Sequence, residues 1–157
     1  MDVYYPPTGF CFRVAFNGVD GTGEDAEQRF QEVSGLSYEI TTEDLNEGGE
    51  NRFTQKLPKR VRYPNLILKR GLVKSTALLK WFESAMNTFF KVTVYDFKPA
   101  DITITLLDEA DQPVAIWNVV QAYPLKWSTS DLKANDNSIV IETIELAYQY
   151  FTRQEVK

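Results

Sequence analysis

The residue types that enzymes most often use for acid–base and nucleophilic chemistry are nearly absent from this sequence. None of its 157 residues is a histidine, which excludes an imidazole general base, Ser-His-Asp and Cys-His pairs and every histidine-containing metal site. Cys11 is the single cysteine. It lies in an alternating apolar segment near Arg13, and we interpret it as a small packing residue rather than a reactive thiolate. We therefore expect no enzyme activity and no catalytic residue.

Three loop sequences have a superficial likeness to ligand sites. Gly18 to Gly23 lacks the spacing and the strand–helix context of a dinucleotide fingerprint, and residues 71–75 lack the glycine that precedes the lysine of a P-loop. Asp20, Glu24 and Asp25 do not have the spacing of an EF-hand. We interpret all three as surface connections and expect no cofactor and no metal. Any two of the 22 acidic residues could meet as a glycosidase pair, but no spacing singles one out.

Charge is distributed unevenly along the chain. The net charge of -5 and the pI near 4.8 argue against a general affinity for nucleic acid. Residues 39–50 nevertheless contain five acids and no base, and residues 51–82 contain nine bases and no acid. The basic block, with Phe53, Tyr63 and Trp81 interleaved, fits a surface for single-stranded nucleic acid, a head-to-tail contact between copies of the chain, or a solvated charged hairpin.

Strand patterns dominate the sequence. Residues 10–16 and 36–41 alternate apolar and polar side chains, and 46–49 reads as a turn. Residues 52–63 look extended, with Pro58 at an edge or a bend. Together these segments predict an extended charged hairpin over about Thr41–Arg62. Further strands are predicted at 66–69, 91–97, 101–107, 114–119, 123–128 and 139–151.

One segment has helical spacing. Ser75 can cap a helix of about Ser75–Asn87, with Leu78, Leu79, Phe82 and Met86 on its apolar face. The sum predicts a mainly β protein, an antiparallel β-barrel or sandwich with one flanking α-helix. No repeat or linker divides the chain, so residues 1–157 are expected to form a single domain.

Several separate motifs resemble one family. They occur in the right order from about Phe10 to Phe151 and comprise Phe30–Leu36, Glu47–Asn51, Lys56–Pro58, Tyr63–Leu72, Ile102–Glu109, Trp117–Asn118, Ala122–Trp127 and Ile141–Leu146. They closely resemble the contractile-phage tail-tube family. Within it, the Tyr-Pro-Leu-Lys-Trp-Ser and Ile-Glu-Leu-Ala-Tyr segments are most similar to inner-tube subunits of phage-tail-like extracellular contractile injection systems.

The resemblance implies a β-barrel with a flanking helix that forms homohexameric rings. The rings would stack into a hollow tube for cargo or DNA passage, inside a contractile sheath. The implied partners are the chain itself, the sheath, a baseplate or spike and a tube terminator. A tube-initiating or terminal ring protein is the alternative within the same machine, and a nucleic-acid-binding β-barrel is the alternative from another class.

Two regions are predicted to serve assembly. The hairpin is expected to make inter-subunit or inter-ring contacts through Glu47, Glu50, Arg52, Lys56, Lys59, Arg60 and Arg62. The strand 139–151 begins apolar on both faces, so one of its ends is expected to be covered by a neighbouring subunit. On this strand Thr143, Glu145 and Gln149 are expected nearer the lumen, and Glu142 interrupts the apolar face.

The sequence also carries an expectation about location. No basic patch followed by an apolar stretch opens the chain, and no window approaches the length of a membrane span. We expect synthesis in the cytoplasm without a signal peptide, no membrane anchoring and no specific nucleic-acid partner. The product would be a phage-tail-like particle, released extracellularly or held in the producing cell.

Overall fold

A computed structural model describes residues 10–19, 27–46, 48–49, 52–72, 77–90, 98–133 and 138–156. One helix, α1 (Ala77–Phe90), follows the sixth strand. The strands are β1 (Cys11–Asn17), β2 (Glu27–Phe30), β3 (Glu32–Ser34), β4 (Glu39–Leu45), β5 (Gln55–Arg62), β6 (Leu66–Gly71), β7 (Ala100–Leu107), β8 (Pro113–Thr129), β9 (Ile141–Ala147) and β10 (Tyr150–Glu155).

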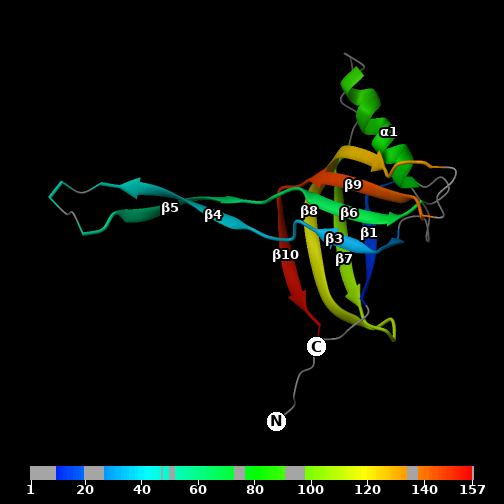
Figure 1. Cartoon of the computed structure of the whole chain (residues 1–157), viewed down its shortest axis with the longest axis horizontal. Helices are drawn as coiled ribbons and strands as arrows, with labels where there is room; N and C mark the ends of the chain where they lie inside the picture. The colour runs from blue at the N-terminus through cyan, green and yellow to red at the C-terminus, as the bar shows by residue number, and fades with distance from the viewer. Residues whose placement is uncertain are drawn as a thin grey trace, which may run out of the picture.

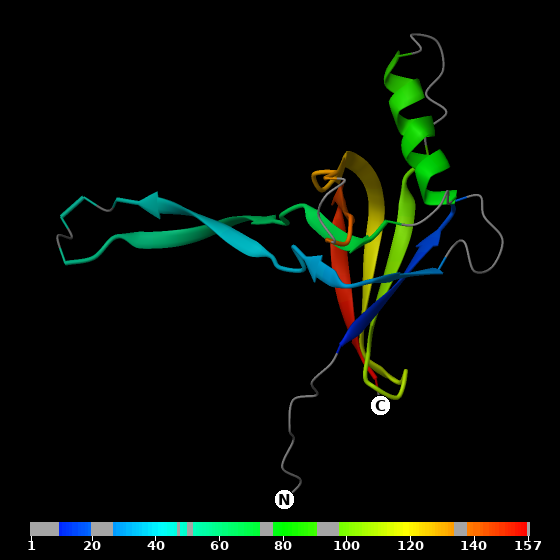
Figure 2. The ribbon, with the colours of Figure 1, turned by 45° about the vertical axis from the view of Figure 1, so that its right-hand side comes forward.

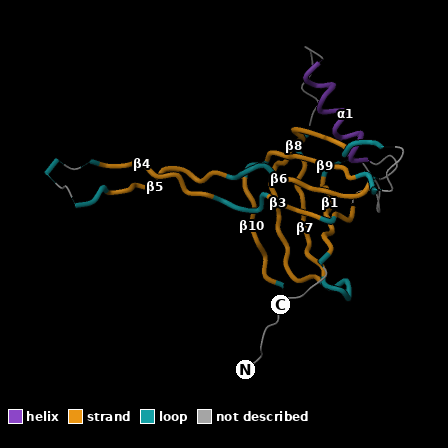
Figure 3. Tube along the Cα trace, in the orientation of Figure 1, coloured by secondary structure: helices purple, strands orange, loops and turns teal. Residues whose placement is uncertain are grey.

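An eight-stranded antiparallel sheet forms the body of the molecule (Figure 1). Seven of the strands follow the order β2-β1-β7-β8-β9-β6-β3. The eighth strand, β10, pairs with β8 and lies outside this linear order. The strands β4 and β5 form a separate two-stranded sheet that projects from the body (Figure 3). The predicted class is confirmed: the protein is mainly β and antiparallel, and its described residues include one helix. Since the path of described strands ends at β2 and β3, the sheet is sandwich-like rather than a closed barrel.

The 17-residue strand β8 serves both halves of the sheet. Its first half pairs with β10 and its second half with β9. The change of partner coincides with a bulge at Gln121, whose φ of 53° is in the left-handed region and whose N–H donates to the Asp101 carboxylate at 2.9 Å. The two strands predicted at 114–119 and 123–128 are therefore one strand with a bulge between them.

The predicted strand over residues 139–151 is interrupted in the structure. It forms β9 and β10, separated at Tyr148 and Gln149, where the Gln149 N–H donates to the Val120 carbonyl at 3.0 Å. An uninterrupted strand over 139–151 would place Tyr150 on the same face as Ile144, but the break moves later side chains by one position. Tyr150 is exposed, and Phe151 packs against the core instead. Residues 36–38 likewise precede β4 instead of forming part of it.

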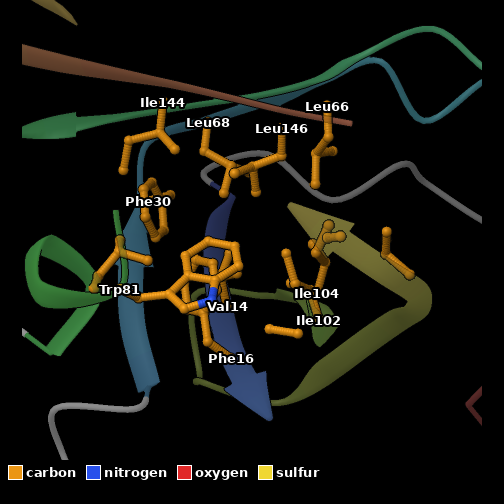
Figure 4. Close-up of a cluster of buried hydrophobic side chains, with 14 of the residues drawn as sticks. Val14, Phe16, Phe30, Leu66, Leu68, Trp81, Ile102, Ile104, Ile144 and Leu146 are labelled. Atoms are coloured by element: carbon orange, nitrogen blue, oxygen red, sulfur yellow. The ribbon is translucent and has the colours of Figure 1, made fainter. Parts of the chain in front are cut away.

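The core lies between the two curled halves of the sheet and under α1. Figure 4 shows side chains from β1, β2, β6, β7, β9 and α1 meeting there. The helix contributes Leu78, Trp81 and Phe82, and the Trp81 indole N–H donates to the Lys98 carbonyl at 3.0 Å. Met86 was predicted on the apolar face of the helix, but it is 59% exposed. Ser75 and the predicted strand 91–97 lie outside the described residues.

Candidate assembly surfaces

The β4–β5 hairpin extends well beyond the body, as two views show (Figures 1 and 2). Cross-strand polar contacts stabilise it. The Thr41 hydroxyl donates to the Arg60 carbonyl at 3.0 Å and accepts the Arg60 N–H at 3.2 Å, and Lys59 lies 3.0 Å from Glu43. A register shift follows Thr41, next to Pro58. Because β5 has a single partner strand, Pro58, which has no N–H to donate, lies on an edge strand as predicted.

The acidic run and the basic run of the sequence lie opposite each other in this hairpin. Glu39 is opposite Arg62, and Asp44 is opposite Lys56. Residues 39–62 contain five acids and five bases, so the hairpin is neutral and the net charge of -5 belongs to the rest of the chain. Part of the predicted acid–base complementarity is therefore satisfied within one copy.

The four predicted contact residues on β5 occupy three different positions. Arg60 and Arg62 share one face of β5, Lys56 lies on the other, and Lys59 is at the irregularity beside Glu43. All four basic side chains are exposed, as is Arg52 in the segment before β5. The predicted contacts of Glu47 and Glu50 fall on residues outside the described part of the chain.

The hairpin also exposes apolar side chains. None of them was among the predicted contact residues, which are all charged. Ile40 and Val61 are cross-strand partners and are 54% and 49% exposed. Phe53, Leu45 and Leu57 are exposed nearer the tip. The available signal was the recurrence of apolar residues within both charged strands. An isolated two-stranded hairpin is only marginally stable in water, so a ribbon with this much exposed apolar surface is suited to being covered.

A second exposed apolar surface lies at the opposite end of β6. Leu72, Leu132 and Ile139 are 58%, 74% and 73% exposed. Backbone hydrogen bonds bring their segments together, from Leu72 N–H to the Val140 carbonyl and from Ser130 N–H to the Ile141 carbonyl. We call Leu72, Leu132 and Ile139 the apolar end. It includes Ile139, which begins the strand predicted over 139–151, one of whose ends was expected to be covered.

A third surface is an apolar groove between α1 and the second half of β8. Phe82 and Trp127 line it with their rings edge to face at 4.8 Å, and the exposed side chains of Met86 and Leu125 line it as well. Its volume is about 360 Å³. Met86, which the sequence analysis placed on the apolar face of the helix, is thus exposed because it lines this groove.

Glu142, which the sequence analysis left without a role, belongs to a buried polar cluster. Its carboxylate accepts a hydrogen bond from the Arg70 Nε at 3.0 Å, and both side chains are almost fully buried. The Arg70 Nη1 also donates to Gln28, and the guanidinium lies over the Phe30 ring at 5.3 Å. Because these residues come from β2, β6 and β9, the cluster ties an end strand of the sheet to the strands across the core.

The predicted lumen residues occupy the side of β9 that faces away from the core. Thr143 lies between Lys69 on β6 and Ser128 on β8, and Glu145 accepts a hydrogen bond from the Asn65 amide at 2.7 Å. Gln149 is at the β9–β10 break rather than within a strand. The structure thus brings Thr143 and Glu145 onto one polar surface, and their position in a tube stays a prediction.

No enzyme-like centre occurs in the part of the chain that the structure describes. Across those residues no three His, Cys, Asp or Glu side chains gather to hold a metal ion, and Cys11 is half-buried on β1. The described helix is too short and too polar to cross a membrane. The acidic loop residues Asp20, Glu24 and Asp25 lie outside the described ranges.

Comparison with models of known protein families shows the family of this chain. The model of the T4-like virus tail tube protein gp19 matches residues 8–152, nearly the whole chain. The chain belongs to this tail tube family. Tail tube proteins are structural, so the prediction that this chain is not an enzyme is confirmed by its family. No curated protein matches the chain.

Solved structures support the same placement of this tail tube protein. A chain of the anti-feeding prophage baseplate is 29% identical, with a TM-score of 0.77, and the match covers 100% of this chain and 99% of that one. A chain of the PVC sheath–tube complex, an extracellular contractile injection system, is 25% identical with a TM-score of 0.76, and the match covers 98% and 95% of the two chains. The predicted resemblance to such systems is confirmed.

More distant structures share the fold of this tail tube protein alone. Hcp1 from Salmonella typhimurium is 14% identical, with a TM-score of 0.60 over 95% of this chain and 88% of that chain. This tail tube protein is thus a tube component of contractile injection systems by family, and its fold extends to more distant Hcp proteins.

Proposed function

We propose that this chain is the repeating subunit of the inner tube, with six copies in each ring and rings stacked into a hollow tube for cargo or DNA passage. The projecting hairpin carries the proposal. It places exposed charged and apolar side chains far from the body, where only another molecule can cover them. Tail tube membership supports the same role.

The exposed surfaces suit head-to-tail association. The hairpin leaves one end of β3 and β6, and the apolar end lies where β6 finishes, on the far side of the body (Figure 1). Two different surfaces on one chain make a heterologous contact, which generates closed rings or open filaments. We infer that a neighbouring copy covers the Ile139 end of β9, with Thr143, Glu145 and Gln149 nearer the lumen.

The proposed partners and location follow from the structures that the chain resembles. Those structures are of a prophage baseplate and of sheath–tube and tube-terminator complexes of an extracellular system. We propose a sheath, a baseplate or spike and a terminator as partners. The chain would be made in the cytoplasm and built into a phage-tail-like particle, released extracellularly or held in the producing cell.

A tube-initiating or terminal ring is the second candidate. A PVC sheath/tube terminator structure at 25% identity and the prophage baseplate at 29% both favour considering it. The two roles differ in polymerisation, because a repeating subunit grows without limit and a terminal ring stops. Electron microscopy of the purified protein over a range of concentrations therefore separates long tubes from single rings. A chain that stays monomeric at every concentration contradicts both.

Charge reversal tests the hairpin as the contact. Arg60→Glu/Arg62→Glu should abolish tubes and leave a folded monomer, because the change is repeated around every ring and along the stack. Each exposed ion pair is worth only up to about 1 kcal/mol, so a large effect must come from repetition. Lys80→Glu/Lys98→Glu is the matched control, with the same change in net charge at exposed positions away from the hairpin. Normal tubes from the hairpin variant would refute the contact.

A further inference from the structure

Four aromatic side chains surround the point where the hairpin joins the body. Tyr38 directly precedes β4 and Tyr63 directly follows β5, while Tyr148 lies in the β9–β10 break and Phe151 near the start of β10. We call these four residues the aromatic junction. Tyr63 is the centre: its ring lies 5.7 Å from Phe151, 5.8 Å from Tyr148 and 6.5 Å from Tyr38. These separations and tilted geometries are those of favourable aromatic pairs.

Two short segments, which we call the legs, connect the hairpin to the body: residues 35–38 before β4 and residues 63–65 after β5. Hydrogen bonds fasten both legs to β9 and to the β9–β10 break. The Tyr148 hydroxyl donates to the Gly35 carbonyl at 3.0 Å in the first leg. In the second leg the Asn65 amide donates to Glu145 at 2.7 Å. Burial first, and then the neighbouring Tyr63, raise the pKa of Tyr148 to about 12, so its hydroxyl keeps the proton that it donates at neutral pH.

The two legs are also packed directly against each other. Gly35 has a φ of +92°, and a Cβ at this position would lie 2.0 Å from the Asn65 carbonyl oxygen. Only glycine meets both conditions, the left-handed backbone and the close approach. The legs therefore leave the body as one unit rather than as two independent linkers.

Among the described strands, no strand pairing joins the hairpin to the body. β4 and β5 pair only with each other, and they form no ladder with the eight-stranded sheet. A ribbon joined to a body by two unpaired legs would otherwise pivot about them. The direction of the ribbon thus depends on the legs and on the rings that pack around them.

We propose that the aromatic junction fixes the direction of the hairpin in the free chain, before any partner binds, with Tyr63, Tyr148 and Phe151 as the positioning residues. The use of this direction in assembly rests on the proposed function. A hairpin that is already aimed loses less conformational freedom on docking, so the junction would favour association without touching the partner. The positioning itself is a property of one isolated chain.

Spin-label distances in the dilute, monomeric chain test this directly. The labels are placed at Lys56→Cys on the hairpin and Glu109→Cys in the β7–β8 turn, in a Cys11→Ser background, and pulsed dipolar spectroscopy gives the distance distribution. We expect one narrow distribution in the parent. Tyr63→Ala should widen it about twofold, because the legs are then free to pivot.

Two further variants compare how much the Tyr148 hydroxyl and the Phe151 ring each contribute to fixing the direction of the hairpin. Tyr148→Phe removes only the hydroxyl and should widen the distribution less than Phe151→Ala, which removes a ring. Tyr150→Ala is the matched control, since it removes an exposed ring from the same strand outside the junction. If Phe151→Ala does not fold, Tyr63→Ala decides, because Tyr63 is not part of the hydrophobic core.

Each outcome bears on the proposal separately from the proposed function. A broad parent distribution, or one that Tyr63→Ala leaves narrow, overturns the positioning role whether or not the parent forms tubes. A narrow parent distribution that widens in the junction variants supports it even if the parent never polymerises, in which case the proposed function alone fails. Equal widening in Tyr150→Ala would also overturn it, because the effect would not belong to the junction.

Discussion

Arg70 carries its charge into the interior, where Glu142, Gln28 and the Phe30 ring surround it. A buried ion pair gains little net free energy, because removing both charges from water costs about as much as their attraction returns. Breaking the pair is different, since one charge then remains buried without its partner. The contribution of this cluster is therefore best measured by comparing single and double substitutions.

Arg70→Ala should lower the free energy of unfolding by about 3–5 kcal/mol, because it leaves the Glu142 carboxylate buried and uncompensated. Arg70→Met/Glu142→Leu replaces both charges with side chains of similar size and should come within about 1 kcal/mol of the parent, or exceed it. Urea denaturation of the dilute monomer gives both values. A double variant as unstable as the single one would contradict this account.

Tyr148 makes stability depend on pH in the alkaline range. Its pKa rises from 10.0 to about 12 on folding, so the folded chain holds this proton more tightly than the unfolded chain. The resulting stability is fully present below pH 10 and is lost as pH rises through 12. Tyr148→Phe should therefore remove part of the loss of stability that the parent shows between about pH 10 and 12. Urea denaturation at both pH values checks this.

Residue types alone predicted the absence of catalysis, but they did not predict the partners of buried groups. Glu142 appeared as an interruption of an apolar face because its partner Arg70 is 72 positions away in the sequence. Strand pairing, not local pattern, brings the two together. The same reason hid the aromatic junction, whose members come from three separate parts of the chain.

Among the elements, the hairpin is the one whose removal should leave the rest intact. Replacing residues 40–61 by Asn-Gly keeps Tyr38 and Tyr63 and removes strands that pair only with each other. The unfolding free energy should stay within about 1 kcal/mol of the parent, since no core contact is lost. Thermal unfolding and electron microscopy should show a stable monomer without tubes. A collapse in stability would mean that the hairpin supports the body.

The local pattern of apolar and polar residues predicted most elements. It failed where contacts between residues far apart in the sequence determine the backbone. The alternation of residues 10–16 predicted β1, and the extended segments on either side of the turn at 46–49 predicted the hairpin. The bulge at Gln121 was not predictable, because it depends on a carboxylate from β7. The β9–β10 break was hidden for a similar reason, since Gln149 pairs with a residue on β8.

At the scale of the molecule, the exposed apolar end should govern association rather than folding. Leu132→Ser/Ile139→Ser changes two side chains that are mostly in water, so monomer stability should change by less than about 0.5 kcal/mol. Burial of each against a neighbour is worth about 1.5–3 kcal/mol, so the concentration needed for assembly should rise at least about tenfold. Sedimentation over a concentration series measures this shift. Val156→Ser serves as the control, and an unchanged threshold would contradict a covered apolar end.

The connection of the hairpin to the body also determines how the molecule bears mechanical load. The ribbon continues the direction of β3 and β6 (Figure 1), and β6 is paired along its length with β9. Tension on the hairpin therefore pulls β6 lengthwise past β9, which loads the cross-strand hydrogen bonds together in shear instead of opening them one after another. A subunit held by its hairpin should consequently resist extension along the ribbon far better than across it.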